Sequence, residues 1–343
     1  MAREKPAATL EEMRAILRSL PGPDLEAGTA AAHREAQLTK PAGALGRLEE
    51  LTQWMATWQG KHPPSADHPR TAVFAGNHGV AARGVSAYPA AVTAQMVQNF
   101  LAGGAAVNQL CRAIDGDLRV YEMALEEPTA DFAQAPAMSD EDCALAIAYG
   151  MMAVEPGIDV IALGEMGIGN TASAAALCCA LFGGTAAEWV GPGTGVAGAA
   201  LANKIAVVDA AVAFHRAAAR DSFDILRRLG GRELAAITGA VMAARRARVP
   251  VVLDGYASTA AAAVLFAADP HALDHCIVAH RSAEPGHIRL LEKIGKKPLL
   301  DLGMRLGEAS GATLAIAVIK AALACHKGMA TFAEAGVSGK EER

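Results

Sequence analysis

The sequence predicts an α/β fold in which helices cover both faces of a mostly parallel, Rossmann-like sheet. Short apolar runs that stop at glycine alternate with long helical patterns rich in alanine and leucine. Aromatic residues are few, with 3 Trp, 4 Tyr and 8 Phe among 343 residues, although 52% of the chain is hydrophobic and 34 residues are glycine. Small apolar side chains suit helices packed closely on a sheet better than an all-β sandwich.

The first 69 residues are expected to be helical. Residues 8–20 form an amphipathic pattern that opens at Thr9, with Glu12 three positions later as in a capping box. A second helix is expected over 24–38. After a turn at 38–46, a third helix should run to about residue 58, before a connector at 60–69 that contains three prolines.

The rest of the chain alternates between strands and helices. Five strands are expected at 71–76, 118–123, 158–163, 249–253 and 275–279, and helices are expected at 90–113, 139–153, 171–182, 201–219, 232–248 and 257–267. Beyond residue 283 the pattern is helical again, and its longest run is 306–328. We therefore expect an N-terminal helical part at 1–69, a sheet domain at 70–282 and a helical C-terminal part at 283–343.

Charge and cysteine content exclude several classes of function. The balance of 31 basic and 36 acidic residues gives a net charge of −5, and the absence of long basic runs argues against nucleic acid or membrane surfaces as partners. Six cysteines without a CxxC pair predict reduced thiols rather than a disulfide framework. No apolar signal core or membrane span is expected, which favours a soluble cytoplasmic protein.

Polar, glycine-containing segments follow three of the expected strands. They are Gly76–Gly79 (GNHG), Gly164–Thr171 (GEMGIGNT) and Asp254–Gly255. Ligands in open α/β sheets bind at the carboxyl ends of the strands, so these segments should line one crevice. Each segment alone would more often be an ordinary turn than a site, but three together favour a site.

Two glycine-rich turns are candidates for binding phosphate. The first comprises Glu165, Met166, Gly167, Ile168, Gly169 and Asn170, just before a helix whose free N–H groups could bind an anion. Its spacing fits neither GxGxxG nor a P-loop. The second turn includes Gly193 and Thr194 and precedes the helix that carries Lys204, a residue that could neutralise a phosphate or simply face solvent.

Local sequence leaves two other features open. Glu308 lies between glycines at an expected helix start, where a carboxylate could cap the helix or act as a general base. Four histidines lie close together in sequence, at 271, 275, 280 and 287. They lack a HExxH motif, so we expect ordinary surface and core histidines and no bound metal.

Long blocks spread over almost the whole chain resemble the nicotinate-nucleotide–dimethylbenzimidazole phosphoribosyltransferase family. The matching blocks are LTKPAGALGRLEEL (38–51), FAGNHGVAARGVSAYP (74–89), VTAQMV (92–97), LGEMGIGNT (163–171), VPVVLDGY (249–256), AHRSAEPGH (279–287), RLGEASGA (305–312) and MATFAEAGV (329–337).

The resemblance implies a fold, an assembly and a reaction. It implies a parallel-sheet domain with a smaller helical domain from both chain ends, and a homodimer. The implied reaction transfers phosphoribose from nicotinate mononucleotide to 5,6-dimethylbenzimidazole, giving α-ribazole 5′-phosphate and nicotinate in cobalamin lower-ligand synthesis. The leaving pyridine is already cationic, so no cofactor or metal is expected.

The resemblance also assigns roles to residues. It implies that Glu308 is the general base and that Leu306 and Gly307 belong to the substrate pocket. Phosphate and ribose contacts are implied for Glu165, Gly167, Gly193 and Lys204. The benzimidazole is expected near Tyr88, Gln95, Met96 and Met166.

Two residues depart from the family pattern, and two other functions remain as alternatives. The common GDHGV is GNHGV here, with Asn77 in place of an acid, and the glycine that usually follows the base is Ala309. A nicotinamide-dependent oxidoreductase would share the fold class, but the sequence lacks its GxGxxG fingerprint. A non-enzymatic nucleotide or base sensor is the other alternative, although a sensor would not need a base at Glu308.

Overall fold

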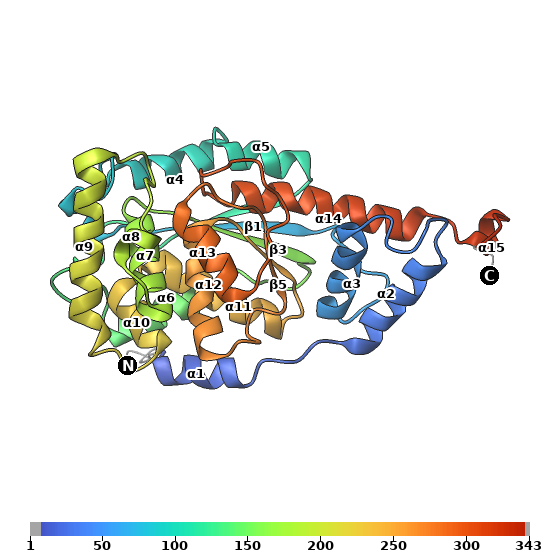
Figure 1. Ribbon diagram of the computed structural model, residues 1–343, viewed down its shortest axis with the longest axis horizontal. Helices are drawn as coiled ribbons and strands as arrows, with labels where there is room; N and C mark the ends of the chain where they lie inside the picture. Colours follow the sequence, from blue (N-terminus) through green and yellow to red (C-terminus); the bar gives the residue numbers. More distant parts are fainter. Residues whose placement is uncertain (1–7, 340–343) are drawn as a thin grey trace, which may run out of the picture.

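The computed structural model describes residues 8–339 and contains a five-stranded sheet in the order β2-β1-β3-β4-β5 (Figure 1). The strands are β1 (Pro69–Ala75), β2 (Asp117–Glu122), β3 (Val160–Met166), β4 (Val251–Leu253) and β5 (Cys276–Val278). Every neighbouring pair is parallel. The predicted fold class and the approximate positions of all five strands are therefore confirmed.

The helices follow the predicted pattern, with differences at glycine-rich positions. They are α1 (Leu10–Arg18), α2 (Leu25–Gln37), α3 (Arg47–Gln59), the 3-10 helix η1 (Gly79–Arg83), α4 (Val92–Ala102), α5 (Ala106–Ala113), α6 (Asp140–Met151), α7 (Asn170–Phe182), α8 (Ala186–Trp189), α9 (Gly198–Arg216), α10 (Ser222–Leu229), α11 (Arg232–Arg246), α12 (Tyr256–Ala268), α13 (Pro285–Ile294), α14 (Ser310–Gly328) and α15 (Phe332–Ala335). The single helix predicted at 90–113 is wrong, because Gly103, with φ 82°, ends α4 before α5 begins.

The boundaries of two functional segments also differ from the prediction. Strand β3 continues past Gly164 to Met166, so Glu165 and Met166 belong to the strand rather than to the loop after it. Helix α14 begins at Ser310 instead of 306, because Gly307, Glu308 and Ala309 all have positive φ values. Both differences place Glu165 and Glu308 on rigid backbone beside the sheet.

Both faces of the sheet are covered by helices. This is expected because successive side chains along a strand point to opposite faces, and the apolar side chains on both faces need to be buried. Phe74, Ile161 and Leu163 point to the face packed by α6, α7, α11 and α12. Val160 and Ala162 point to the opposite face, which α14 and α3 cover. The edge strand β2 is half exposed and carries charges, which discourages pairing with another sheet edge.

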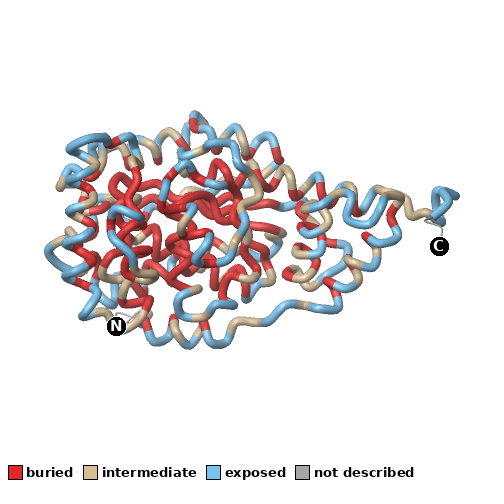
Figure 2. Tube along the Cα trace, viewed as in Figure 1, coloured by how far each residue is buried: buried red, intermediate tan, exposed pale blue. Residues whose placement is uncertain are grey.

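Helices α2 and α3 meet the end of α14 beside the sheet. Helix α3 packs against both α2 and α14, and Leu38 forms an isolated bridge with Thr331. The guanidinium of Arg34 donates to the carbonyl of His326 at 2.8 Å, while Glu35 bonds the His326 ring at 2.7 Å. Figure 2 shows fewer buried residues here than around the sheet. We propose that α2, α3 and the end of α14 form the smaller helical domain.

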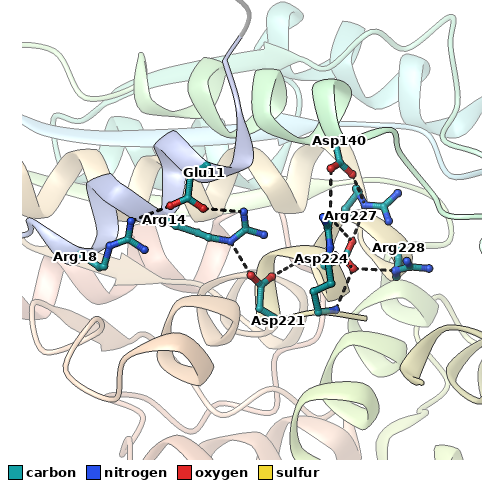
Figure 3. Close-up of polar contacts among 9 residues, drawn as sticks. Glu11, Arg14, Arg18, Asp140, Asp221, Asp224, Arg227 and Arg228 are labelled. Atoms are coloured by element: carbon teal, nitrogen blue, oxygen red, sulfur yellow. Dashed lines mark hydrogen bonds and ion pairs between the residues drawn. The ribbon is translucent and has the colours of Figure 1, made fainter. Parts of the chain in front are cut away.

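Helix α1 packs on the main body, against α6. Arg14 of α1 donates to Asp221 at 2.6 Å, immediately before α10 (Figure 3). Asp224, whose side chain is fully buried, accepts hydrogen bonds from Arg227 and Arg228. The Asp224 N–H donates to Asp221 Oδ1 at 2.8 Å, so a backbone hydrogen bond joins the Arg14–Asp221 pair to the ion pairs of Asp224.

Two helices, α9 and α14, are long and apolar enough to cross a membrane by length and composition alone. Half of the apolar window of α14 is buried, where this helix packs against β1, β3 and β4. A buried core helix passes the same test, so this observation is weak evidence for a membrane span. All six cysteines are free thiols, and five of them are buried.

Candidate active site

A cavity of about 560 Å³ lies at the carboxyl ends of the strands. The strand order reverses direction at the neighbouring strands β1 and β3, and such switch points are where ligands bind in open α/β sheets. Residues from the ends of β3, β4 and β5, from α4 and from the loop before α14 line it. The predicted crevice is therefore present, and its wall contains both carboxylates and apolar side chains.

Glu308 is held in this cavity by a strained turn. Its φ is 62° and that of Ala309 is 58°, a left-handed conformation that is uncommon for residues other than glycine. The Glu308 N–H donates to the carbonyl of Glu165 at 3.2 Å. A side chain at Gly164 would collide with the backbone of Ala309, so this glycine allows the turn to rest directly on β3.

Three buried carboxyl groups lie close enough to influence one another. Burial raises the pKa of Glu308 to about 7, with a smaller contribution from the charge of Asp254. Burial also raises the pKa of Glu165 well above its ordinary value, assisted by the charge of Asp254. A carboxylate with a pKa near neutrality is a stronger base than usual and still ionises at physiological pH.

Asp254 anchors the start of α14 from the end of β4. Its Oδ1 accepts a hydrogen bond from the N–H of Ala312 at 2.8 Å, and the side chain is fully buried. His280 lies 3.7 Å from the same oxygen. A side chain at Gly311 would collide with the His280 ring, so the ring and the helix terminus are in tight contact. Strands β4 and β5 thus fix the segment that follows Glu308.

The first predicted phosphate turn leads into α7. Gly169, with φ 102°, precedes the first helical residue, Asn170. The Asn170 amide donates to Glu165, and the side chains of Asn170 and Thr171 line the cavity. The amino end of α7 therefore faces the cavity wall, as an anion site at a helix start requires.

The second predicted phosphate turn lies beside Lys204. The Lys204 ammonium donates to Thr171 Oγ1 at 2.9 Å and to the carbonyl of Gly191 at 3.0 Å. Burial lowers the pKa of Lys204 to about 8. Glu284 contacts the same turn, where its Oε1 accepts a hydrogen bond from the Gly193 N–H at 2.8 Å.

Most of the residues predicted for the site line this one cavity. They are Tyr88, Met96, Glu165, Met166, Gly167, Ile168, Asn170, Gly193, Thr194, Leu306, Gly307 and Glu308. Three others lie outside its lining. Gly169 lies behind the wall against His78, the exposed Gln95 points elsewhere on α4, and Lys204 lies behind Gly193. The roles given to all of these residues stay predictions.

Several lining residues were not singled out as site residues from the sequence. Tyr256, His280, Ser282, Glu284 and Arg305 all face the cavity. The blocks VPVVLDGY, AHRSAEPGH and RLGEASGA contain them, so the resemblance carried a signal for each one. Their local sequence alone gave none, because each reaches the cavity through long-range packing.

The segment after β1 supports the floor of the site. His78 Nε2 lies 2.6 Å from Glu233 Oε1, and both side chains are fully buried. The Asn77 amide donates to the carbonyl of Leu125 at 2.9 Å. An ionised aspartate at this position would have no hydrogen to donate to that carbonyl. Asn77 is absent from the residues that line the cavity.

The clustered histidines have separate structural contacts. His271 is exposed and pairs with Asp274, whereas His275 is buried and bonds the carbonyl of Val241 at 2.9 Å. His287 accepts the N–H of Ser282 at 3.0 Å. Residues 8–339 contain no group of three or more His, Cys, Asp or Glu side chains that could hold a metal ion.

Comparison with known proteins gives matches along nearly the full chain. A family model described as "Phosphoribosyltransferase" matches residues 20–337. The chain is 59% identical over 331 residues to the nicotinate-nucleotide–dimethylbenzimidazole phosphoribosyltransferase of Rhizobium meliloti (strain 1021), covering 96% of this chain and 98% of that protein. Its counterpart in Brucella anthropi is 56% identical over 331 residues, with the same coverage.

A solved structure agrees with these matches. The crystal structure of the same enzyme from Thermus thermophilus has a TM-score of 0.86 and 40% sequence identity to this chain, and covers 92% of this chain and 100% of its own. Identity at this level over whole chains carries both the fold and the family. The chain belongs to the nicotinate-nucleotide–dimethylbenzimidazole phosphoribosyltransferase family.

Proposed function

We propose that this protein transfers phosphoribose from nicotinate mononucleotide to 5,6-dimethylbenzimidazole, with Glu308 as the general base. As a member of its family it is a phosphoribosyltransferase of cobalamin lower-ligand synthesis. One observation supports the mechanism above all others, namely the buried Glu308 carboxyl in the cavity wall with its pKa raised to about 7.

The chemistry needs one base and no strong acid. The pyridine nitrogen of nicotinate mononucleotide carries a positive charge, so it leaves as a neutral base when the bond to C1′ of the ribose breaks. One benzimidazole nitrogen attacks C1′ while the other loses its proton. Glu308 accepts that proton, which prevents a second cation from building up on the incoming ring.

The cavity wall suggests where each substrate binds. The apolar side chains of Tyr88, Met96, Met166 and Leu306 line the same cavity as Glu308 and suit a flat dimethylated ring. The amino end of α7 and the turn at Gly193 suit the phosphate, with Lys204 behind them. We therefore place the benzimidazole next to Glu308 and the phosphate next to Gly193.

Two further features belong to this proposal. We infer that the protein acts as a homodimer, as the family resemblance implies, and that it works in the cytoplasm, where its six free thiols would stay reduced. The non-enzymatic sensor is disfavoured, since binding alone needs no carboxyl group of raised pKa beside the ligand.

A single reaction tests the function. Purified protein is mixed with nicotinate mononucleotide and 5,6-dimethylbenzimidazole, and both nicotinate and α-ribazole 5′-phosphate are quantified by chromatography. We expect the two products in equal amounts. Omission of the benzimidazole is the control, because release of nicotinate without it would indicate hydrolysis instead of transfer. A well-folded protein that forms neither product would refute the proposal.

A further inference from the structure

One corner of the cavity combines two cations with an internal carboxylate. We call it the anion corner and define it by Thr171, Gly193, Glu284 and Arg305, which line the cavity, and by Lys204 behind them. These residues come from α7, from the turns before α9 and α13, from the loop before α14 and from α9 itself. The inference below concerns Glu284 and rests on the proposed function.

The Glu284 carboxylate occupies a backbone donor of the turn where we place the phosphate. Its Oε1 accepts the Gly193 N–H at 2.8 Å. Its Oε2 is buried without a hydrogen-bond partner among residues 8–339, and it packs so closely that a side chain at Gly191 would collide with it. With only 4% of the residue exposed, this carboxylate has little access to water.

Two cations act on the Glu284 carboxylate. Lys204 of α9 and Arg305 attract the carboxylate, and Arg305 also bonds the carbonyl of Gly193 at 3.3 Å. The hydroxyl of Tyr256 of α12 is a further titratable group, and it feels the charge of Glu284. Burial raises the pKa of Glu284 above its ordinary value, although the charge of Lys204 opposes this. The ionised carboxylate thus cancels one of two positive charges.

We propose that Glu284 is an internal substitute for the substrate's phosphate, which gives up its charge and its hydrogen bond to Gly193 when the phosphate of nicotinate mononucleotide binds. One proton moves from solvent to the Glu284 carboxyl, and no covalent bond between heavy atoms forms or breaks. The Gly193 N–H and the charge of Lys204 then serve the phosphate. Glu284 thereby determines how strongly the corner selects a phosphate over weaker anions.

The proposal predicts that nucleotide binding is linked to proton uptake. Two neighbouring anions repel each other strongly in a buried site, so the phosphate favours the protonated form of Glu284. Neutral glutamine in place of Glu284 has no charge to give up. We therefore expect Glu284→Gln to bind nicotinate mononucleotide about tenfold more tightly than the wild type and with less proton uptake.

Isothermal titration calorimetry at pH 7.0 measures the affinity for each ligand. Repeating it in two buffers of different ionisation enthalpy gives the number of protons taken up on binding. At this pH a phosphate ester, whose second pKa is about 6, and Lys204, whose pKa is about 8, each keep most of their charge. Nicotinate mononucleotide and its nucleoside without phosphate are each titrated into the wild type and Glu284→Gln. Glu292→Gln, an exposed carboxylate on α13, is the matched control.

The wild type alone gives a first result, which does not depend on a variant folding. More protons should be taken up with the nucleotide than with the nucleoside, and equal uptake would overturn the proposal. In Glu284→Gln the difference should disappear while the affinity for the nucleotide rises. Weaker nucleotide binding by this variant would instead make Glu284 a direct ligand of the substrate.

Lys204→Ala separates this inference from the function itself. If the wild type binds the nucleotide but Lys204→Ala binds it equally well, the phosphate lies elsewhere and the role of Glu284 fails while the transferase activity can stand. If the wild type binds no nicotinate mononucleotide at all, the proposed function and the inference fail together. Loss of nucleotide affinity in Lys204→Ala, with nucleoside affinity kept, supports the anion corner.

Discussion

Glu308 combines two unfavourable features, a left-handed backbone and a buried acidic group. Each costs on the order of 1–3 kcal/mol in typical proteins, and such costs persist where the surrounding structure enforces them. Here the contacts of the turn with Glu165 and Gly164 provide that support. The result is a carboxylate that is poorly solvated and therefore readily accepts a proton.

Replacement of this residue should lower activity and raise stability together. We expect Glu308→Gln to reduce turnover by about 10²–10⁴-fold, the usual contribution of a general base. The wild-type carboxyl keeps its proton to about pH 7 when folded but ionises near its ordinary value of 4.5 when unfolded. Ionisation therefore favours unfolding as the pH rises between these values, and the neutral variant should melt at a higher temperature at pH 8.

Turnover and melting temperature of the same preparation check this prediction. Wild-type turnover should also fall as the pH drops below about 7, since the protonated carboxyl cannot act as a base. If Glu308 merely capped α14, its replacement would instead lower the melting temperature and leave turnover intact. Glu292→Gln on the exposed side of α13 should change neither quantity.

At the scale of elements, the start of α14 connects the sheet to the catalytic turn. Strand β3 supports the turn directly, Asp254 just after β4 accepts a hydrogen bond, and His280 just after β5 packs against the helix start. The first helical N–H groups have no partner inside their own helix, so an acceptor from elsewhere must satisfy them. Asp254 supplies that acceptor although it lies 58 positions from Ala312 in sequence.

Paired substitutions of Asp254 separate its hydrogen bond from its charge. Asp254→Ala leaves a buried N–H unsatisfied, so we expect a loss of about 1–3 kcal/mol in unfolding free energy and a lower kcat. Asp254→Asn keeps an acceptor oxygen but removes a charge that raises the pKa of Glu308. This variant should keep much of the kcat at high pH and shift the acid limb of the pH profile downward. Equal loss of kcat in both variants, without that shift, would contradict a role in positioning Glu308.

A second cluster of charges surrounds Asp224 of α10, next to the Arg14–Asp221 pair that reaches α1 (Figure 3). Although burial opposes ionisation, hydrogen bonds from Arg220, Arg227 and Arg228 hold the pKa of Asp224 far below its ordinary value of 3.8. The folded state thus gains stability above pH 3.8 that is lost as the pH falls toward the depressed pKa.

Removal of the Asp224 charge tests this contribution. We expect Asp224→Asn to lower the free energy of unfolding at pH 7 by about 3 kcal/mol, because it leaves three arginines without their shared partner. Denaturant titrations at pH 7 and pH 3 measure the effect, which should shrink at the lower pH. The exposed Asp209 on α9 offers a matched control, and Asp209→Asn should change little. A deficit that is equal at both pH values would argue against an electrostatic origin.

At the scale of the whole molecule, sequence patterns predict the features that depend on local hydrophobic periodicity and on the positions of glycine residues. The approximate positions of the strands follow from such patterns, and so does the glycine-rich turn between β3 and α7. They do not reveal Glu284, because its bond to Gly193 spans 91 positions and depends on how α13 packs against α8. The start of α14 was misplaced because two non-glycine residues, Glu308 and Ala309, adopt a left-handed conformation that only tertiary contacts stabilise.

The proposed homodimer is the prediction that concerns the whole molecule. Tyr88 and Leu306 line the cavity, yet each is more than half exposed, so apolar surface remains open to water at its mouth. A second copy that covered such surface would gain free energy from its burial, at roughly 25 cal/mol per Å². We expect light scattering at micromolar concentration to give twice the 35.2 kDa mass of one chain. Dilution toward nanomolar concentration should lower turnover per chain if the dimer dissociates in that range. A mass of one chain at micromolar concentration, with full activity, would show that each subunit works alone.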